Sequence, residues 1–313
     1  MTVERQRCAI GLDVGGTKMA AGVVDLQSGQ LLARSTRATQ PQRGGQAVLD
    51  DALSLAEQLL AQARAQAWDV TGLGVSVCEL VDLDGHVTSG HAVEWRGLPV
   101  REQFTRLAPA VVESDVRAHA LAEATWGAGR GQRQFVFVTV GTGISSCLVL
   151  DGRPYAGARG NALVLASSPL ALPCPMCGNT HWPALEDFAA GPALVARYNA
   201  LGGRPVASAE ELMAAAAAGD PVARDVVHSG GQALGASLGW LVNVLDPDVI
   251  LVGGGLGTAG GLYWDSLVDA TRAHVWSEAS RQLPILPARL GPDAAVAGAA
   301  LAGAARQSVF APV

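Results

Sequence analysis

The sequence predicts an α/β protein made of two similar domains, each with a mixed sheet flanked by helices. Two stretches, 8–25 and 135–150, each join apolar, β-rich runs across a short turn of glycine and threonine. The chain has 313 residues and is 49% hydrophobic, which suffices for two cores and is long for one domain. A repeated motif in a chain of this length indicates a duplicated α/β unit.

The first hairpin carries groups that suit an anion. Its turn runs from Asp13 through Gly15, Gly16 and Thr17 to Lys18, and we expect the glycines to supply the positive φ angles of a tight turn. Uncovered glycine N–H groups, a hydroxyl and an ammonium can together surround a phosphate. The carboxylate of Asp13, at the end of the strand, could hold hydrated Mg²⁺ beside that phosphate. The alternative is an ordinary hairpin with a polar turn.

The segment between the two hairpins predicts strands at 31–35 and 70–77, a helix at 47–67, and a strand end that runs into a helix at 111–123. In the long helix, apolar residues recur at helical spacing without Gly or Pro. At the start of the last helix, Ser114 or Asp115 could cap the free N–H groups. The loop over 78–95 carries several carboxylates, and a solvated acidic loop is the simplest interpretation of it.

The glycine and threonine turn returns at Gly141, Thr142 and Gly143, again between two apolar strands. Two such hairpins suggest a duplicated domain with a nucleotide held between the halves. Further elements are predicted at 209–218 (a helix with a capping box), 221–244 (a long helix), 249–252 (a buried strand) and 294–305 (a final helix). The strand ends in a third glycine turn, Gly253, Gly254 and Gly255.

With these motifs the chain resembles the actin, hexokinase and heat-shock 70 superfamily and, more narrowly, the ROK family of bacterial sugar kinases and regulators. The resemblance covers about 8–305. It implies two actin-like (ribonuclease H-like) domains, 1–117 completed by a C-terminal helix at 294–313, and 118–293, with nucleotide and sugar in the cleft between them. It also implies that Mg-ATP binds the two hairpins and that adenosine lies against Gly253 to Gly255.

The same resemblance implies a glucokinase-like reaction, the ATP-dependent phosphorylation of a hexose at its 6-hydroxyl. Asp115 matches the family's catalytic Asp, where a carboxylate can take the proton from the attacking hydroxyl. Helix capping is the structural alternative for Asp115. Ser114 and Arg117 replace the two Asn residues that flank this Asp in the family. Either ATP or polyphosphate could donate the phosphoryl group.

The sugar side departs from the family pattern. Asn161 and Val164 stand where most members have a Glu and a His that grip sugar hydroxyls, whereas Glu186 matches a sugar-binding carboxylate. Glu79 replaces a family glycine, and a carboxylate there would pair well with an ammonium. The hypotheses are therefore a glucokinase-like enzyme, an amino-hexose (kanosamine-type) kinase, and a catalytically weakened sugar- or nucleotide-binding protein.

A structural zinc site is predicted at Cys174, Cys177 and His181, where the resemblance places an altered form of the family's zinc motif. A Cys-x-x-Cys pair is a common zinc knuckle, and His181 could be a third ligand. Free thiols or a redox pair are the alternatives, and no fourth ligand is evident.

Composition excludes several classes of partner. The net charge of −6 argues against a nucleic-acid surface, and no apolar run is long enough for a membrane span. The first seven residues lack the apolar core of a signal peptide and are too few for the winged-helix module of ROK repressors. We therefore expect a cytoplasmic homo-oligomer, most simply a dimer, that binds a small sugar and a nucleotide.

Overall fold

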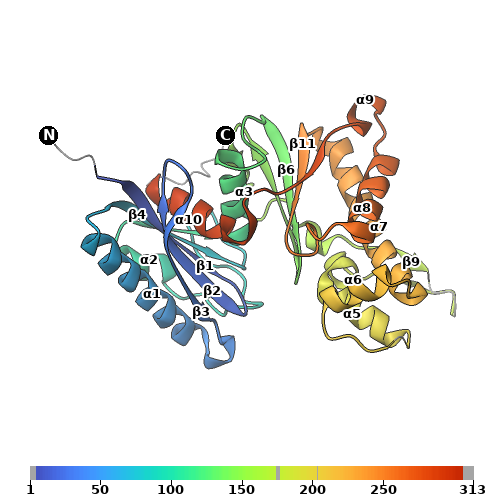
Figure 1. The fold of residues 1–313 in the computed structure, drawn as a ribbon, viewed down its shortest axis with the longest axis horizontal. Helices are drawn as coiled ribbons and strands as arrows, with labels where there is room; N and C mark the ends of the chain where they lie inside the picture. The colour runs from blue at the N-terminus through green and yellow to red at the C-terminus, as the bar shows by residue number, and fades with distance from the viewer. Residues whose placement is uncertain (1–4, 174–176, 203, 306–313) are drawn as a thin grey trace. The chain divides into compact units, whose positions relative to one another are not determined.

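A computed structural model describes residues 5–173, 177–202 and 204–305. Contacts divide the chain into two compact units, and Figure 1 labels several elements of each. The first unit takes in residues up to 133, 147–162 and those from 289 onward, and the second takes in 134–146 and 163–288. The domain boundary expected after residue 117 falls inside a helix, α3 (Asp115–Thr125), that belongs wholly to the first unit.

The first sheet has the strand order β3-β2-β1-β4-β5. Its strands are β1 (Arg7–Val14), β2 (Lys18–Asp25), β3 (Leu31–Ala38), β4 (Asp69–Val77) and β5 (Ala110–Ser114). β2 runs antiparallel to both β1 and β3, whereas β4 runs parallel to both β1 and β5. The helical elements described alongside it are η1 (Pro41–Arg43), α1 (Gly45–Ala65), α2 (Val100–Thr105), α3, η3 (Gly291–Asp293) and α10 (Ala294–Ala304).

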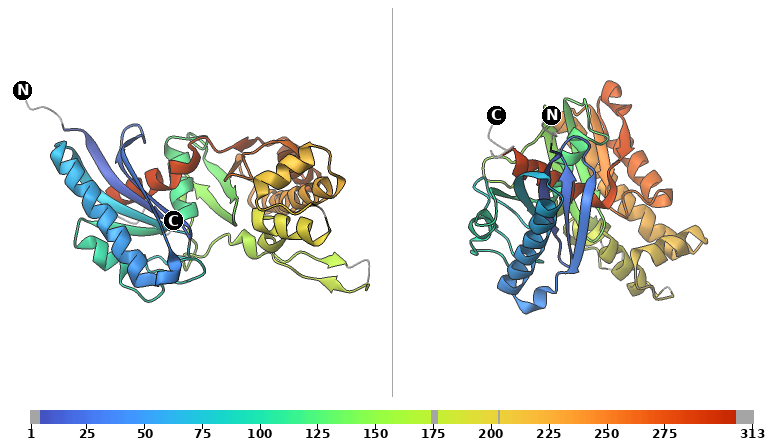
Figure 2. Two further views of the ribbon diagram at one scale, coloured as in Figure 1. Left: turned by 60° about the horizontal axis from the view of Figure 1, so that its bottom comes forward. Right: turned by 60° about the vertical axis from the view of Figure 1, so that its left-hand side comes forward.

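The central strand β1 is buried on both faces. Ile10 and Leu12 pack in a core with the apolar side of α1, and the intervening Ala9 packs in another core with α10. Because strand side chains alternate between faces, α1 and α10 cover opposite sides of this sheet, as Figures 1 and 2 show. α10 lies directly on the backbone of the sheet, because a Cβ on Gly11 would come within 1.9 Å of the carbonyl oxygen of Val296.

The second sheet repeats this plan with the order β12-β11-β6-β7-β8. Its strands are β6 (Gln134–Val140), β7 (Ile144–Leu150), β8 (Arg153–Pro154), β11 (Val249–Gly253) and β12 (Ile285–Pro287). In both sheets a central strand has its hairpin partner on one side and a parallel strand on the other. The duplicated α/β unit predicted from the two hairpins is therefore confirmed.

Besides β6, the start of β7, β11 and β12, the second unit contains one 3₁₀-helix, six α-helices and a short hairpin among its described residues. They are η2 (Leu165–Ser167), the strands β9 (Leu172–Pro173) and β10 (Thr180–His181), then α4 (Glu186–Ala189), α5 (Gly191–Ala200), α6 (Ala209–Ala217), α7 (Pro221–Leu245), α8 (Gly261–His274) and α9 (Glu278–Arg281). α7 packs on α8 through Gly231, Gly235 and Gly239, where a Cβ would come within 2.3–2.7 Å of an α8 carbonyl oxygen. In the described part of the chain, none of the helices is both long enough and apolar enough to cross a membrane.

Candidate active site

The first glycine turn is held from both sides and leaves its polar side chains exposed. The N–H of Gly15 donates to the carbonyl of Lys18 at 3.1 Å, which closes the turn between β1 and β2. The hydroxyl of Thr39 donates to the carbonyl of Gly15 at 2.6 Å, and the N–H of Thr39 donates to the carbonyl of Thr17. The side chains of Thr17 and Lys18 are exposed, so a hydroxyl and an ammonium are available to an anion.

Glycine suits this turn for a different reason from the one expected. Neither Gly15 nor Gly16 has a positive φ, so that part of the prediction is wrong. A Cβ on Gly16 would lie 3.1 Å from the Cβ of Ala92, and one on Gly15 would lie 3.2 Å from the carbonyl oxygen of Lys18. Close contacts therefore favour glycine here, with the turn's own Lys18 carbonyl at Gly15 and with the side chain of Ala92 at Gly16.

Two carboxylates of the first unit interact near this turn. Asp13 is partly buried at the end of β1 and accepts a hydrogen bond from the hydroxyl of Ser76 at 2.8 Å. Burial raises the pKa of Asp13, and the Ser76 hydrogen bond and the charge of Lys18 only partly offset this effect. Asp115 is the first residue of α3, and its Oδ1 accepts from the N–H of Val116 at 2.6 Å.

The environment of Asp115 suits a general base. Burial raises the pKa of Asp115 to about 7, and the negative charges of Asp13 and Glu79 add to the effect. The N–H of Val116 and the charge of Arg117 act in the opposite direction. A carboxyl group whose pKa lies near neutral pH can accept a proton in the transition state and release it afterwards. The capping role considered for Ser114 is absent, because its side chain makes no cap hydrogen bond.

Glu79 is not available to a substrate ammonium, which corrects the role expected for it. The side chain is 5% exposed, and its carboxylate accepts from the hydroxyl of Ser89 and from the N–H groups of His91, Ala92 and Val93. Burial alone would raise its pKa, but these hydrogen bonds outweigh burial and lower it. Each oxygen already has two donors, so Glu79 organises the loop at 89–93.

The other residues expected on the sugar side lie in three places. Ser114 is buried, and its N–H donates to the carboxylate of Glu113 at 2.7 Å. Asn161 and Val164 are both exposed, and the turn before Asn161 is closed by a bond from the N–H of Ala162 to the carbonyl of Ala156. Ser114 and Asn161 belong to the first unit with Asp115, whereas Val164 belongs to the second.

Glu186 supports the second glycine hairpin. Its Oε2 accepts from the N–H of Ile144 at 2.7 Å, and a Cβ on Gly143 would lie at the same distance from that oxygen. The N–H of Gly141 donates to the carbonyl of Gly143 at 3.0 Å and closes the turn. The carboxylate expected to bind sugar is thus engaged with the backbone of the phosphate-type turn, next to the exposed side chain of Thr142.

A cavity of about 900 Å³ opens beside this hairpin within the second unit. Its lining includes Gly141, Thr142 and Gly255, and it also takes in the start of α5 at Gly191 and Pro192. This volume lies in the range of sites that enclose a small-molecule ligand. Two of the three predicted glycine turns therefore border one cavity.

The third glycine turn needs its glycines for several reasons. Gly254 has φ +81°, and a Cβ there would lie 2.3 Å from the carbonyl oxygen of Val140. Gly253 is buried with a Cβ position 3.1 Å from the ring of Phe137. Gly255 is exposed with nothing within 4 Å of its Cβ position, so it presents bare backbone to the cavity.

Part of the cavity wall was missed by the sequence motifs. Asn199 from α5, and Ser208, Glu210 and Met213 at or near the start of α6, line the cavity together with the glycine turns. The predicted cap is present, because the Ser208 hydroxyl oxygen accepts from the N–H of Glu211 at 3.2 Å, whereas the Glu211 carboxylate accepts from the N–H of Ala207 at 2.8 Å and not from that of Ser208. The Ser208 and Glu211 spacing located the start of the helix, but no local sequence pattern indicated that this end of α6 lines a cavity.

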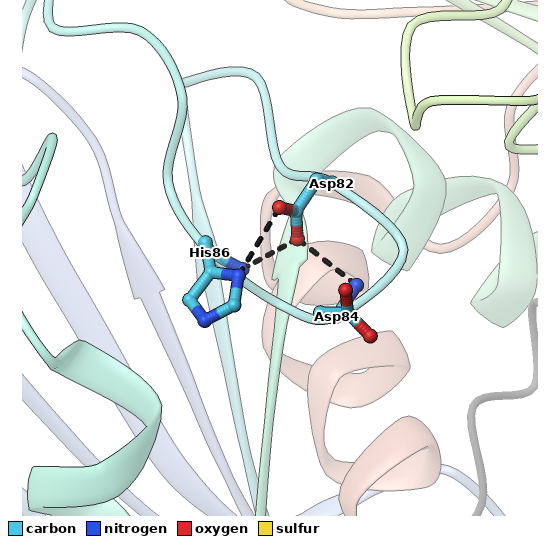
Figure 3. Close-up of side chains that lie close together, drawn as sticks. All are labelled: Asp82, Asp84 and His86. Atoms are coloured by element: carbon cyan, nitrogen blue, oxygen red, sulfur yellow. Dashed lines mark hydrogen bonds and ion pairs between the residues drawn. The ribbon is translucent and has the colours of Figure 1, made fainter.

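The acidic loop after β4 contains a compact group of Asp82, Asp84 and His86 (Figure 3). Oδ1 of Asp82 accepts from the N–H groups of Asp84 at 2.9 Å and His86 at 2.8 Å, and its Oδ2 lies 3.1 Å from Nδ1 of His86. Burial alone would raise the pKa of Asp82, but the hydrogen bonds from His86 and Asp84 lower it. These bonds account for the group as a turn held by one aspartate.

The zinc prediction rests on three residues, of which Cys174 lies outside the described residues. Cys177 is an exposed free thiol and His181 is exposed at the end of β10. Among the described residues, the His, Cys, Asp and Glu side chains that lie close enough together to share a metal ion are the three in Figure 3. Neither Cys177 nor His181 is one of them. Zinc binding at this hairpin therefore stays a prediction.

Comparison with known proteins gives a consistent result. A model of the ROK family matches residues 9–305. A glucokinase from Streptomyces coelicolor is 29% identical over 313 aligned positions, covering 93% of this chain and 96% of the relative. A ROK hexokinase structure from Thermus thermophilus is 33% identical with a TM-score of 0.79, covering 95% and 97% of the two chains. A ROK family glucokinase from Streptomyces griseus, solved with glucose and AMPPNP, is 29% identical with a TM-score of 0.78, covering 95% and 99%. These likenesses confirm the fold class expected from the motifs.

Proposed function

The chain belongs to the ROK family and is an ATP-dependent sugar kinase, and from that premise we propose that it transfers the γ-phosphoryl group of ATP to the 6-hydroxyl of a hexose. The observation that carries the proposal is Asp115, a carboxylate at the start of α3 with a pKa raised to about 7. In this proposal its carboxylate accepts the proton of the sugar hydroxyl as that oxygen attacks phosphorus.

Asp13 is the proposed holder of the magnesium ion. It is a partly buried carboxylate whose pKa is raised by burial, with the exposed Lys18 as a nearby cation. An oxygen ligand of this kind fits Mg²⁺, which is commonly bound through one or two carboxylates, several waters and substrate phosphates. When bound, the ion would neutralise charge that develops on the phosphates.

The nucleotide is proposed to bind through both glycine hairpins. Gly15, Thr17 and Lys18 would contact phosphates in the first unit, and Thr142 and Gly143 would do so in the second. The cavity beside Gly255 is proposed for the adenosine, because its glycine-rich wall lets a flat ring approach the backbone. Glu186 would support the nucleotide site, because its carboxylate accepts from the N–H of Ile144 and so holds the second hairpin.

The sugar is proposed to contact Asp115, Ser114 and Asn161 in the first unit. Asn161 offers a neutral amide where most family members have a Glu, so we propose a hexose pocket with altered hydroxyl recognition. The amino-hexose hypothesis loses its motivating group, because all four acceptor positions of Glu79 are occupied. Glucose is therefore the first substrate to test.

A catalytically weakened binding protein is the competing function. It would retain the glycine turns but would not need a carboxyl group with a pKa near neutral. The test is a coupled-ADP assay over glucose, mannose, N-acetylmannosamine and amino sugars with wild type and Asp115→Asn. We expect kcat to fall about 10² to 10⁴-fold in the variant with nucleotide affinity nearly unchanged, because the variant loses general-base catalysis. A variant that keeps more than roughly a tenth of wild-type kcat would refute the role of Asp115.

The pH dependence offers an independent check. Because Asp115 must be ionised to accept a proton, kcat/KM should fall as the pH drops through about 7. The measurement is kcat/KM for the best sugar from pH 5.5 to 8.5 at saturating Mg-ATP. A profile that is flat across this range would contradict the assignment.

A further inference from the structure

Arg117 is a buried cation that joins segments far apart in the sequence. It is 5% exposed, and its guanidinium pairs with the carboxylate of Glu113, which is also buried at 4% exposure. The same guanidinium donates through Nη1 to the carbonyl of Gly160 and through Nη2 to the carbonyl of Val81 at 2.7 Å. All four residues belong to the first unit.

Two of the three partners lie beside residues of the proposed sugar site, and the third lies in the acidic loop after β4. Glu113 is two residues before Asp115 at the end of β5, Val81 is in the loop that follows Glu79, and Gly160 immediately precedes Asn161. The Gly160 turn also rests directly on the loop, because a Cβ on Gly160 would lie 2.1 Å from the carbonyl oxygen of Val81. Gly160 has φ +81°, so a side chain there would strain the backbone as well.

From these contacts we infer that Arg117 is a positioning residue, which fixes the turn bearing Asn161 relative to Asp115 and thereby sets the affinity for the sugar. This inference rests on the proposed function. A planar guanidinium with five donors can serve a carboxylate and two carbonyls at once, whereas an ammonium has three donors around a single nitrogen. A lysine at this position would keep the positive charge but would lose the paired guanidinium nitrogens that donate to the carbonyls of Val81 and Gly160.

Positioning of the sugar site by Arg117 differs in its consequences from simple stabilisation of the fold. A buried ion pair contributes little net stability, but removing one partner leaves an uncompensated charge and destabilises the fold. Replacing both members with neutral side chains removes that penalty, although the contacts to Val81 and Gly160 stay lost. Stability and sugar affinity should therefore respond differently to a single and a double substitution.

The test compares Arg117→Lys, Arg117→Met and the double variant Glu113→Gln/Arg117→Met with wild type. For Arg117→Lys we expect the KM for the sugar to rise at least about tenfold while the KM for ATP changes less than about twofold, because one or both charge-assisted bonds to the loops are lost. The double variant should recover most of the melting temperature lost in Arg117→Met but keep the high sugar KM. Arg101→Met is the matched control, because the exposed Arg101 donates to the carbonyl of Asp84 in the same loop.

Two results would overturn the inference. One is a wild-type sugar KM in Arg117→Lys, and the other is a double variant that recovers sugar KM together with stability. Sugar affinity is measured in parallel by titration calorimetry, so that a failure of the proposed reaction can be distinguished from a failure of the role of Arg117. A wild type that binds sugar without phosphorylating it would refute the proposed reaction, and the dissociation constants of the variants would then decide the role of Arg117. A wild type that binds none of the sugars tested would overturn both.

Discussion

Asp115→Asn should stabilise the unliganded protein while it abolishes most of the activity. The pKa of Asp115 is raised to about 7, chiefly by burial and then by the charge of Asp13, from an ordinary value of 3.8. Ionised Asp115 is therefore less stable in the folded chain than in the unfolded chain. Asparagine resembles the protonated aspartic acid in shape and carries no charge, so the variant avoids that penalty.

The size and the sign of the effect follow from linkage. Because the folded-state pKa is the higher one, the stability contributed by this group is fully present below about pH 4 and is lost as the pH rises to about 7. A difference of one pKa unit corresponds to about 1.4 kcal/mol, so the penalty approaches about 4 kcal/mol at pH 8 and is under about 2 kcal/mol at pH 5. Because the side chain retains some exposure, water reduces the effect and these values are upper limits.

The assay is thermal unfolding of wild type and Asp115→Asn at pH 5, 6, 7 and 8 without ligands. The variant should melt on the order of 5–10 °C above wild type at pH 8, and by clearly less at pH 5. Asp51→Asn is a control of opposite sign, because hydrogen bonds from Arg43 are the main cause that lowers the pKa of Asp51. That control should be destabilised to a similar degree at pH 5 and pH 8. An equal gain for Asp115→Asn at both pH values, or a loss at pH 8, would refute the reasoning.

Three further predictions concern the loop, the glycine turn and the metal. Glu79→Gln should destabilise the protein by about 1–3 kcal/mol, because the amide N–H₂ of the glutamine would face two hydrogen-bond donors. The same variant should leave the ratio of kcat/KM for glucose to kcat/KM for amino-glucose unchanged, and a changed ratio would return Glu79 to the sugar site. Gly254→Ala should lower the melting temperature, whereas Gly255→Ala should leave it unchanged and raise the KM for ATP. A larger loss of melting temperature in Gly255→Ala than in Gly254→Ala would contradict the assigned geometry. Protein purified without chelators should contain about one zinc per chain and lose it in Cys177→Ala, and metal analysis that finds no zinc in wild type would leave free thiols.

The sequence by itself determined the features that depend on neighbouring residues. Apolar, β-rich runs and glycine turns predicted both hairpins, and apolar residues at helical spacing predicted α1, because these patterns report local backbone geometry and burial. The position of Asp115 at a junction of strand and helix was readable for the same reason. The glycine motifs and their order also sufficed to indicate the family.

Only the tertiary structure decided how these groups are used. Glu79 looked free in the sequence, but its carboxylate is occupied by donors 10 to 14 residues away, and Arg117 reaches the carbonyl of Gly160 across 43 residues. Glycine at the second position of the first turn is favoured by the approach of Ala92 to Gly16 and not by a positive φ angle. Hydrogen-bond partners and close approaches of this kind depend on which distant segments pack together, and no local pattern of residues encodes that choice.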